Sequence, residues 1–129
     1  MIRIANGLPY TRVILKHHGQ ERLLDHVLVD TGSGGTIFST DILLSLGIHY
    51  DMQDEIHRIR GVGGAEFVFS KTVEQIAIEG VVLNNVQIEV GGLDYGLPLD
   101  GILGMDVLLR MPAVIDLAQC SLSQGYVRT

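Results

Sequence analysis

The stretch VLVDTGSGGTIFST, residues 27–40, ends a run of apolar residues on a carboxylate. The apolar run is typical of a buried strand, and small residues crowd the turn behind Asp30. A carboxylate at the end of a buried strand must be hydrogen-bonded or protonated. Glycines in the turn allow a sharp bend and bring backbone N–H groups close to the acid. The turn is therefore predicted to hold Asp30 rigidly, with one face of the carboxylate left open.

The composition is that of a folded protein without a polyanionic partner. The 129 residues are 47% hydrophobic and 19% charged, which is enough for a real core, and we expect a single domain over 1–129. The net charge of -6 and the absence of a basic cluster argue against nucleic acid and against an anionic membrane as partners. No apolar run reaches the length of a membrane span, and the N-terminal stretch lacks the apolar core of a signal peptide. We therefore expect a cytoplasmic protein.

The pattern along the chain predicts mostly strands. Aliphatic and β-branched runs at 11–16 and 22–29 flank the turn-like HHGQE. Two short helices are predicted, one over STDILLSLG, which Gly47 can end in a left-handed conformation, and one between Gly104 and Pro112. Further strands are predicted at 36–38, 56–60, 66–70 and 73–78, as one strand or a pair in 80–92, in the apolar run before Gly104, and as two short strands in 113–124.

One carboxylate is a poor catalyst of peptide hydrolysis. One carboxyl group must take a proton from water while another gives a proton to the carbonyl oxygen, and two carboxyls close together share one proton. The chain has one Asp-Thr-Gly, at 30–32. A second copy must then come from a second chain, and symmetric pairing about an axis through Asp30 would supply it.

Four motifs in order make the chain resemble the retropepsin-like aspartic proteases, over nearly its whole length. The resemblance implies an all-β fold, a closed acid-protease β-barrel with one or two short helices. The motifs are VLVDTGS at 27–33, like the family's active-site turn; IRGVGGAEFVF at 59–69, like its glycine-rich flap; GILGMDVL at 101–108, similar to its apolar-apolar-Gly motif and helix; and AVIDLAQCSLS at 113–123, like the terminal strands of cellular members.

The resemblance also implies a function, that of an aspartic endopeptidase. Such a hydrolase would act as a C2 homodimer on a peptide or protein substrate, with no cofactor. Each chain would give Asp30 to a shared dyad that activates water. Thr31 would bond across the dimer and Gly32 would allow close approach of the backbone, while the hydroxyl of Ser33 is expected to donate to the carboxylate itself.

The substrate contacts that the resemblance implies lie in two places. A flap would close over the substrate with its tip, and an apolar residue would pack under the active-site turn. These residues are Gly61, Val62, Gly63 and Gly64 in the flap and Ile102 under the turn.

Two other functions stay open. The stretch VDTGSGGT also resembles the first phosphate loop of the actin and sugar-kinase fold, and backbone N–H groups in such a turn bind anions. That fold needs a second lobe, for which this chain is short, and the negative charge repels nucleotide. The other alternative is a non-catalytic dimeric module of the same fold that binds peptides, but the presence of Asp30 favours the enzyme.

The histidines and the single cysteine are interpreted as structural or surface residues. Adjacent residues on a strand, such as His17 and His18, are expected to point to opposite faces. No further ligand lies at a suitable spacing, so no metal site is predicted. Cys120 lies in a strand-like stretch and is expected to be a small buried hydrophobe rather than a nucleophile.

Overall fold

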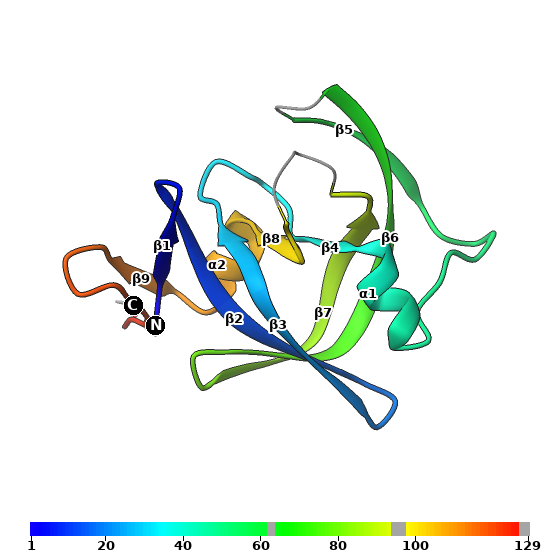
Figure 1. The fold of residues 1–129 in the computed structure, drawn as a ribbon. Helices are drawn as coiled ribbons and strands as arrows, with labels where there is room; N and C mark the ends of the chain where they lie inside the picture. The colour runs from blue at the N-terminus through cyan, green and yellow to red at the C-terminus, as the bar shows by residue number, and fades with distance from the viewer. Residues whose placement is uncertain (62–63, 94–97, 127–129) are drawn as a thin grey trace.

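The fold was examined in a computed structural model that describes residues 1–61, 64–93 and 98–126 (Figure 1). The helices are α1 (Thr40–Ser45) and α2 (Met105–Arg110). The strands are β1 (Arg3–Ala5), β2 (Leu8–His17), β3 (Gln20–Val29), β4 (Ile37–Ser39), β5 (Ile56–Gly61), β6 (Gly64–Ile78), β7 (Val81–Gly91), β8 (Gly101–Leu103), β9 (Ala113–Asp116) and β10 (Ser121–Gln124). Neither helix is long and apolar enough to cross a membrane, among the residues described.

Six of the strands close into a barrel. Their order is β2-β3-β8-β4-β7-β6, and residues 13–16 of β2 pair antiparallel with residues 75–78 of β6 to complete the ring. β1 pairs with β2 outside the ring, and β5 pairs with β6 at the edge of the sheet. The parallel pairing of β3 with β8 brings the end of β3 beside the start of α2. The all-β fold with a closed barrel and two short helices is thus confirmed.

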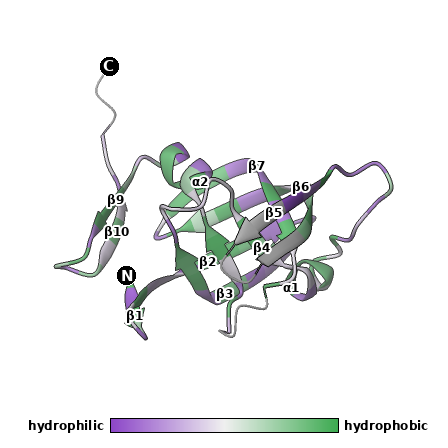
Figure 2. Cartoon of the chain, turned by 90° about the horizontal axis from the view of Figure 1, so that it is seen from above, coloured by the Kyte–Doolittle hydropathy of each residue, from purple (hydrophilic) through white to green (hydrophobic). Residues whose placement is uncertain are grey.

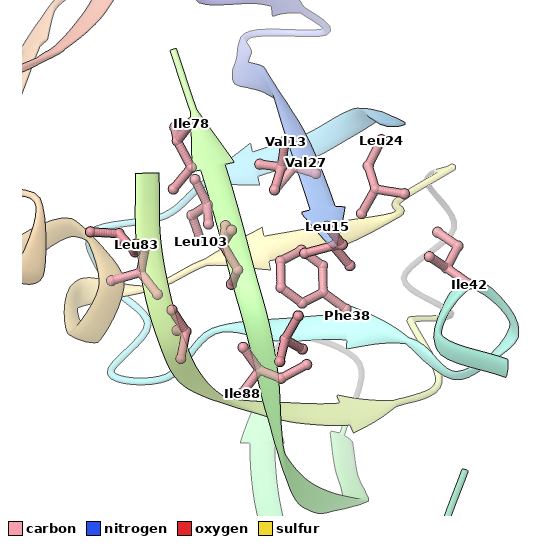
Figure 3. Packing of buried hydrophobic residues seen from close by; sticks show 14 of the residues in the cluster. Val13, Leu15, Leu24, Val27, Phe38, Ile42, Ile78, Leu83, Ile88 and Leu103 are labelled. Carbon is pink, nitrogen blue, oxygen red and sulfur yellow. The ribbon is translucent and has the colours of Figure 1, made fainter. Parts of the chain in front are cut away.

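The core fills the inside of this barrel. Along β2, buried Val13 and Leu15 alternate with exposed residues, as expected for a strand with one face inward. Figure 3 shows side chains from opposite walls of the barrel converging around Phe38, which has no exposed surface. Burial of an aromatic or aliphatic side chain of this kind contributes about 1.5–3 kcal/mol. The apolar faces of the strands, joined by buried side chains from both helices, therefore form the core that holds the fold.

The last two strands lie apart from the barrel. β9 and β10 form a two-stranded sheet of their own, next to β1 and the N-terminus (Figure 2). The backbone N–H of Ile2 donates to the carbonyl oxygen of Cys120 at 2.8 Å, and Leu122 of β10 is buried in the core. The two ends of the chain are thereby joined at one side of the barrel.

Three local predictions are wrong. Residues 66–70 and 73–78 form one strand, the 15-residue β6, because β7 pairs with it continuously through residues 71 and 72. Cys120 is only half-buried and occupies a turn with a left-handed φ of 50°, not a strand. His17 and His18 do not point to opposite faces, since His18 leaves the strand with a φ of 47° and the two rings stack at a centroid distance of 4.0 Å.

Candidate active site

Asp30 stands where β3 ends, and its own turn holds it. The Asp30 backbone N–H donates to the carbonyl oxygen of Leu103 at 3.0 Å, which continues the pairing of β3 with β8 by one residue. The N–H of Gly32 donates to the Asp30 carboxylate at 2.9 Å. The N–H of Ser33 donates to the Asp30 carbonyl oxygen at 3.2 Å and closes the turn. Asp30 is therefore held by its backbone on both sides, and its carboxylate accepts the backbone N–H of a glycine of the turn, as the sequence predicted.

Ser33 differs from its predicted role. Its hydroxyl donates to the carbonyl oxygen of Gly35 at 2.7 Å, across the turn. A hydroxyl has one proton to give, so this bond leaves none for Asp30. The expectation that Ser33 donates to the carboxylate is wrong, because the turn brings the Gly35 carbonyl oxygen into hydrogen-bond distance of the hydroxyl. Ser33 braces the turn rather than the acid.

A side chain would be crowded at two glycines around this turn. A Cβ on Gly32 would lie 3.2 Å from the Asp30 carboxylate oxygen, a tight contact that the carboxylate would have to yield to. A Cβ on Gly104 would lie 2.2 Å from the carbonyl oxygen of Gly35 and 2.9 Å from that of Ser33. The backbone of the turn therefore rests directly on the backbone between β8 and α2.

A latch between the buried Thr36 and the exposed Asp106 completes this contact, and the sequence did not reveal it. The Thr36 side chain is fully buried. Its hydroxyl donates to Asp106 Oδ1 at 2.7 Å and accepts the N–H of Gly104 at 3.0 Å. The N–H of Met105 donates to the Ser33 carbonyl oxygen at 2.7 Å. The turn after β3 is thus bonded to the start of α2 at both of its ends.

The remaining predicted residues of this region lie on both sides of the turn. Thr31 is exposed at its tip. Ile102 pairs with Leu28 on one side and with Ile37 on the other, and only 7% of it is exposed. Ile102 therefore lies in the sheet beside the turn, where its side chain helps to fix the neighbouring strands.

The β5–β6 hairpin rises from the same end of the barrel as the turn after β3 (Figure 1). Its strands pair from Ile56 with Phe69 as far as Gly61 with Gly64. The predicted tip residues Val62 and Gly63 lie outside the described residues. Phe67 is 70% exposed, although it is a large apolar side chain. The hairpin therefore carries apolar surface that the chain itself does not cover.

Two ion pairs anchor the base of this hairpin. Lys71 Nζ lies 2.8 Å from both Asp51 Oδ2 and Asp54 Oδ2. The hydrogen bond from Lys71, with that from the Asp51 backbone, lowers the pKa of Asp54 below its usual range. Burial alone would lower the pKa of Lys71, but its hydrogen bonds with Asp51 and Asp54 outweigh burial and raise it. Both shifts favour the charged forms of Asp54 and Lys71, so this ion pair is charged at neutral pH.

The comparison with protein families agrees with this geometry. The family model described as aspartyl protease matches residues 13–107, which include the turn after β3, the β5–β6 hairpin and β8. No curated protein matches the sequence. The turn that holds Asp30 thus lies inside the matched span, with its supporting residues from β8 and the start of α2.

Proposed function

The chain belongs to the aspartyl protease family, and from this premise we propose that it is an aspartic endopeptidase that acts as a C2 homodimer. The family supports peptide hydrolysis in general terms. The observation that carries the proposal is the Asp30 carboxylate, held by the N–H of Gly32 on a turn that is bonded to β8 and α2. Such a preorganised acid is suited to chemistry rather than to capping a turn.

The homodimer follows from the number of carboxylates that the reaction needs. The sequence holds one Asp-Thr-Gly, and Asp30 is half-exposed at the end of its strand. A two-fold axis that passes next to Asp30 would bring two copies into contact. The exposed Thr31 lies at the tip of the same turn and is proposed to bond across this axis to the partner's turn.

The proposed reaction uses the two Asp30 groups in different protonation states. The ionised carboxyl takes a proton from water as the water oxygen bonds to the peptide carbon, and the protonated carboxyl gives its proton to the carbonyl oxygen. In the second step the C–N bond breaks, the nitrogen receives a proton, and the hydroxyl proton returns to a carboxylate. The products are a carboxylic acid and an amine, and the pair of carboxyls is restored.

Two further parts of the chain are assigned to the dimer and to the substrate. The terminal strands β1 and β9 and the turn between β9 and β10 carry exposed apolar side chains, namely Ile4, Val114 and Leu117, and we assign the interface to this side. The β5–β6 hairpin is proposed to act as a flap, with 61–64 at its tip and Phe67 turned toward bound peptide. Ile102 is proposed to support the turn from the sheet at its side.

The test combines oligomeric state with cleavage. The full chain is expected to sediment as a dimer and to cut peptides from a degenerate library. Asp30→Asn should lower the rate of peptide cleavage at least about 10²–10⁴-fold, because an amide can neither accept the proton nor share it. Asp41→Asn, at an exposed acid on α1, is the matched control and should keep full activity. A monomer that cleaves at the wild-type rate, or activity kept in Asp30→Asn, would refute the proposal.

A further inference from the structure

Two histidines and a glutamate meet at the end of the barrel that faces away from the catalytic turn. His17 ends β2, His18 lies in the turn between β2 and β3, and Glu74 comes from β6. One ligand atom from each side chain lies within 4.8 Å of the others. We propose that these three side chains bind a divalent transition-metal ion, zinc being the one that they suit best.

The position of the group follows from the pairing of β2 with β6. Lys16 pairs with Gln75, so that His17 comes level with Glu74. His18 and Gly19 then both take left-handed φ values, 47° and 80°, which turns the His18 ring back over that of His17. The rings stack at a centroid distance of 4.0 Å and an angle of 27°. A turn that stacks two imidazoles also brings their nitrogen atoms together.

Backbone hydrogen bonds hold the glutamate against this turn. The His18 N–H donates to Glu74 Oε1, which leaves Glu74 Oε2 without a partner among the residues described. The Glu74 N–H donates to His17 Nδ1 at 3.3 Å. This long bond is the only one on a ring nitrogen of either histidine in the described part of the chain. The His18 imidazole and one carboxylate oxygen are therefore available as metal ligands, and a metal ion on His17 Nδ1 would replace the long bond from the Glu74 N–H.

The donor set selects the ion. Imidazole nitrogen and carboxylate oxygen are ligands that Zn²⁺ accepts, and two histidines with one glutamate leave a fourth position for water. Metal–ligand bonds of about 2.0–2.2 Å place two ligand atoms at most about 4.4 Å apart. The ligand atoms of the three side chains lie within 4.8 Å of one another. His18 and Glu74 are exposed and His17 is half-buried, so a small side-chain movement would bring these atoms to the shorter distances that a bound ion needs.

A bound ion would join the strands at which the barrel closes. Residues 13–16 and 75–78 form the pairing that turns the sheet into a ring, and the metal ligands continue this pairing at its end. The turn between β2 and β3 lies at the bottom of the view in Figure 1, whereas the turn that holds Asp30 lies at the top. An ion that binds the folded chain but not the unfolded one stabilises the fold by mass action. The proposed role is therefore structural and independent of the peptidase proposal.

The first experiment titrates the metal-free full chain, prepared with a chelator, with ZnCl₂ in a calorimeter. We expect one Zn²⁺ per chain and a melting temperature that rises by roughly 5 °C or more at 100-fold excess over the dissociation constant. No heat of binding up to millimolar zinc, with an unchanged melting temperature, would overturn the proposal.

Matched variants then locate the ion. Glu74→Gln keeps an acceptor for the His18 N–H but loses the anionic ligand, and His18→Asn keeps a residue that tolerates left-handed φ but loses the imidazole. Each should weaken zinc binding at least about 10-fold, as loss of a metal ligand does. His49→Gln, an exposed histidine elsewhere, and Asp30→Asn should bind zinc as the wild type does. Equal affinity in all four variants would overturn the assignment to this group and leave the peptidase proposal untouched.

Discussion

The turn after β3 and the β5–β6 hairpin lie at the same end of the barrel but are held in opposite ways. The turn is bonded on several sides, through Leu103, Met105, Gly104 and Asp106, all of which come from one short segment around β8 and α2. Within the described part of the chain, the hairpin pairs only with itself beyond its base. The difference teaches that the chain fixes its acid in advance, whereas the hairpin, which we propose covers the substrate, is joined to the barrel mainly at its base.

The buried surfaces of the two regions show the same contrast. Thr36 at the end of the turn is fully buried, and Gly104 leaves no room for a side chain against it. On the hairpin, Ile56 and Phe67 are both mostly exposed. Regions with few buried contacts open with low free energy, whereas densely bonded ones open only with the whole fold. Substitutions in the turn should therefore affect stability, and those in the hairpin should affect binding.

Gly104→Ala is expected to have the largest effect on stability. The added Cβ would lie 2.2 Å from the Gly35 carbonyl oxygen and 2.9 Å from that of Ser33. Both oxygens belong to the backbone, so neither can rotate away as a side chain could. We expect a loss of about 3 kcal/mol in the free energy of unfolding, at the upper end for overpacking. Urea denaturation of the wild type and the variant measures this loss.

The control for this change is Gly34→Ala, in the same turn. Nothing lies within 4 Å of a Cβ at Gly34, and its φ is not left-handed. Its free energy of unfolding should stay within about 0.5 kcal/mol of the wild type or rise slightly. Equal destabilisation by the two changes would contradict the view that the turn rests on the segment after β8.

Thr36→Val is expected to be the next largest change. The shape is kept, but the buried N–H of Gly104 loses its acceptor, whereas the exposed Asp106 carboxylate keeps the backbone N–H groups of Thr36 and Val107. An unsatisfied buried group costs about 1–3 kcal/mol. Thermal and urea unfolding should show this loss, whereas Thr72→Val, at an exposed position of β6, should change stability by less than about 0.5 kcal/mol. A neutral Thr36→Val would mean that the latch adds nothing to the fold.

Lys71→Met tests the base of the hairpin and should have a small effect on global stability. The change removes the pairs with Asp51 and Asp54. We expect faster amide hydrogen exchange in β5 with little change in the strands of the barrel. Exchange that accelerates equally in β3 and β8 would contradict the separate anchoring of the hairpin.

The same anchor should depend on acid in a predictable direction. The pKa of Asp54 is lowered in the folded chain by the Lys71 hydrogen bond, so the pair stabilises the fold above the ordinary pKa of an aspartate. That contribution is lost as the pH falls below about 4, through the lowered pKa. The difference in the free energy of unfolding between Lys71→Met and the wild type should therefore shrink toward low pH. Urea unfolding between neutral and acid pH measures this difference.

Phe67→Ser should have the smallest effect on stability and a clear effect on cleavage. The side chain is 70% exposed, so the free energy of unfolding should change by less than about 0.5 kcal/mol. If the hairpin covers the substrate, KM should rise several-fold through lost apolar contact. Leu44→Ser, an exposed apolar residue on α1, is the control and should leave KM unchanged. An unchanged KM in Phe67→Ser would remove this side chain from the proposed substrate contacts.

The sequence was sufficient to predict what depends on local pattern. Alternating and apolar runs identified the strands, and Gly47 does end α1 with a left-handed φ of 76°. The Asp-Thr-Gly turn and the three other motifs indicated the barrel before any coordinates. Each of these signals spans only a few residues, and the physics that it reflects is local.

Contacts between distant segments could not be predicted in the same way. Thr36 and Asp106 are 70 residues apart, and a threonine after glycines gives no sign that it will be buried against an acid. Glu74 is 56 residues from His18, and the two meet only because the barrel closes between β2 and β6.

One local contact was also predicted wrongly. The Ser33 hydroxyl was assigned to the Asp30 carboxylate, but it donates to the carbonyl oxygen of Gly35. The backbone conformation of the turn, which the sequence does not specify, determines which oxygen the hydroxyl reaches.

The central claim, that two chains share one catalytic site, is tested most directly by mixing subunits. Wild-type chains and Asp30→Asn chains are equilibrated in varying ratios at constant total concentration, and the rate of peptide cleavage is measured for each mixture. If the site needs an Asp30 from both chains, the rate falls with the square of the wild-type fraction, to about one quarter in an equal mixture. A rate that falls in simple proportion, to about one half, would show that each chain carries a complete site and would contradict the account.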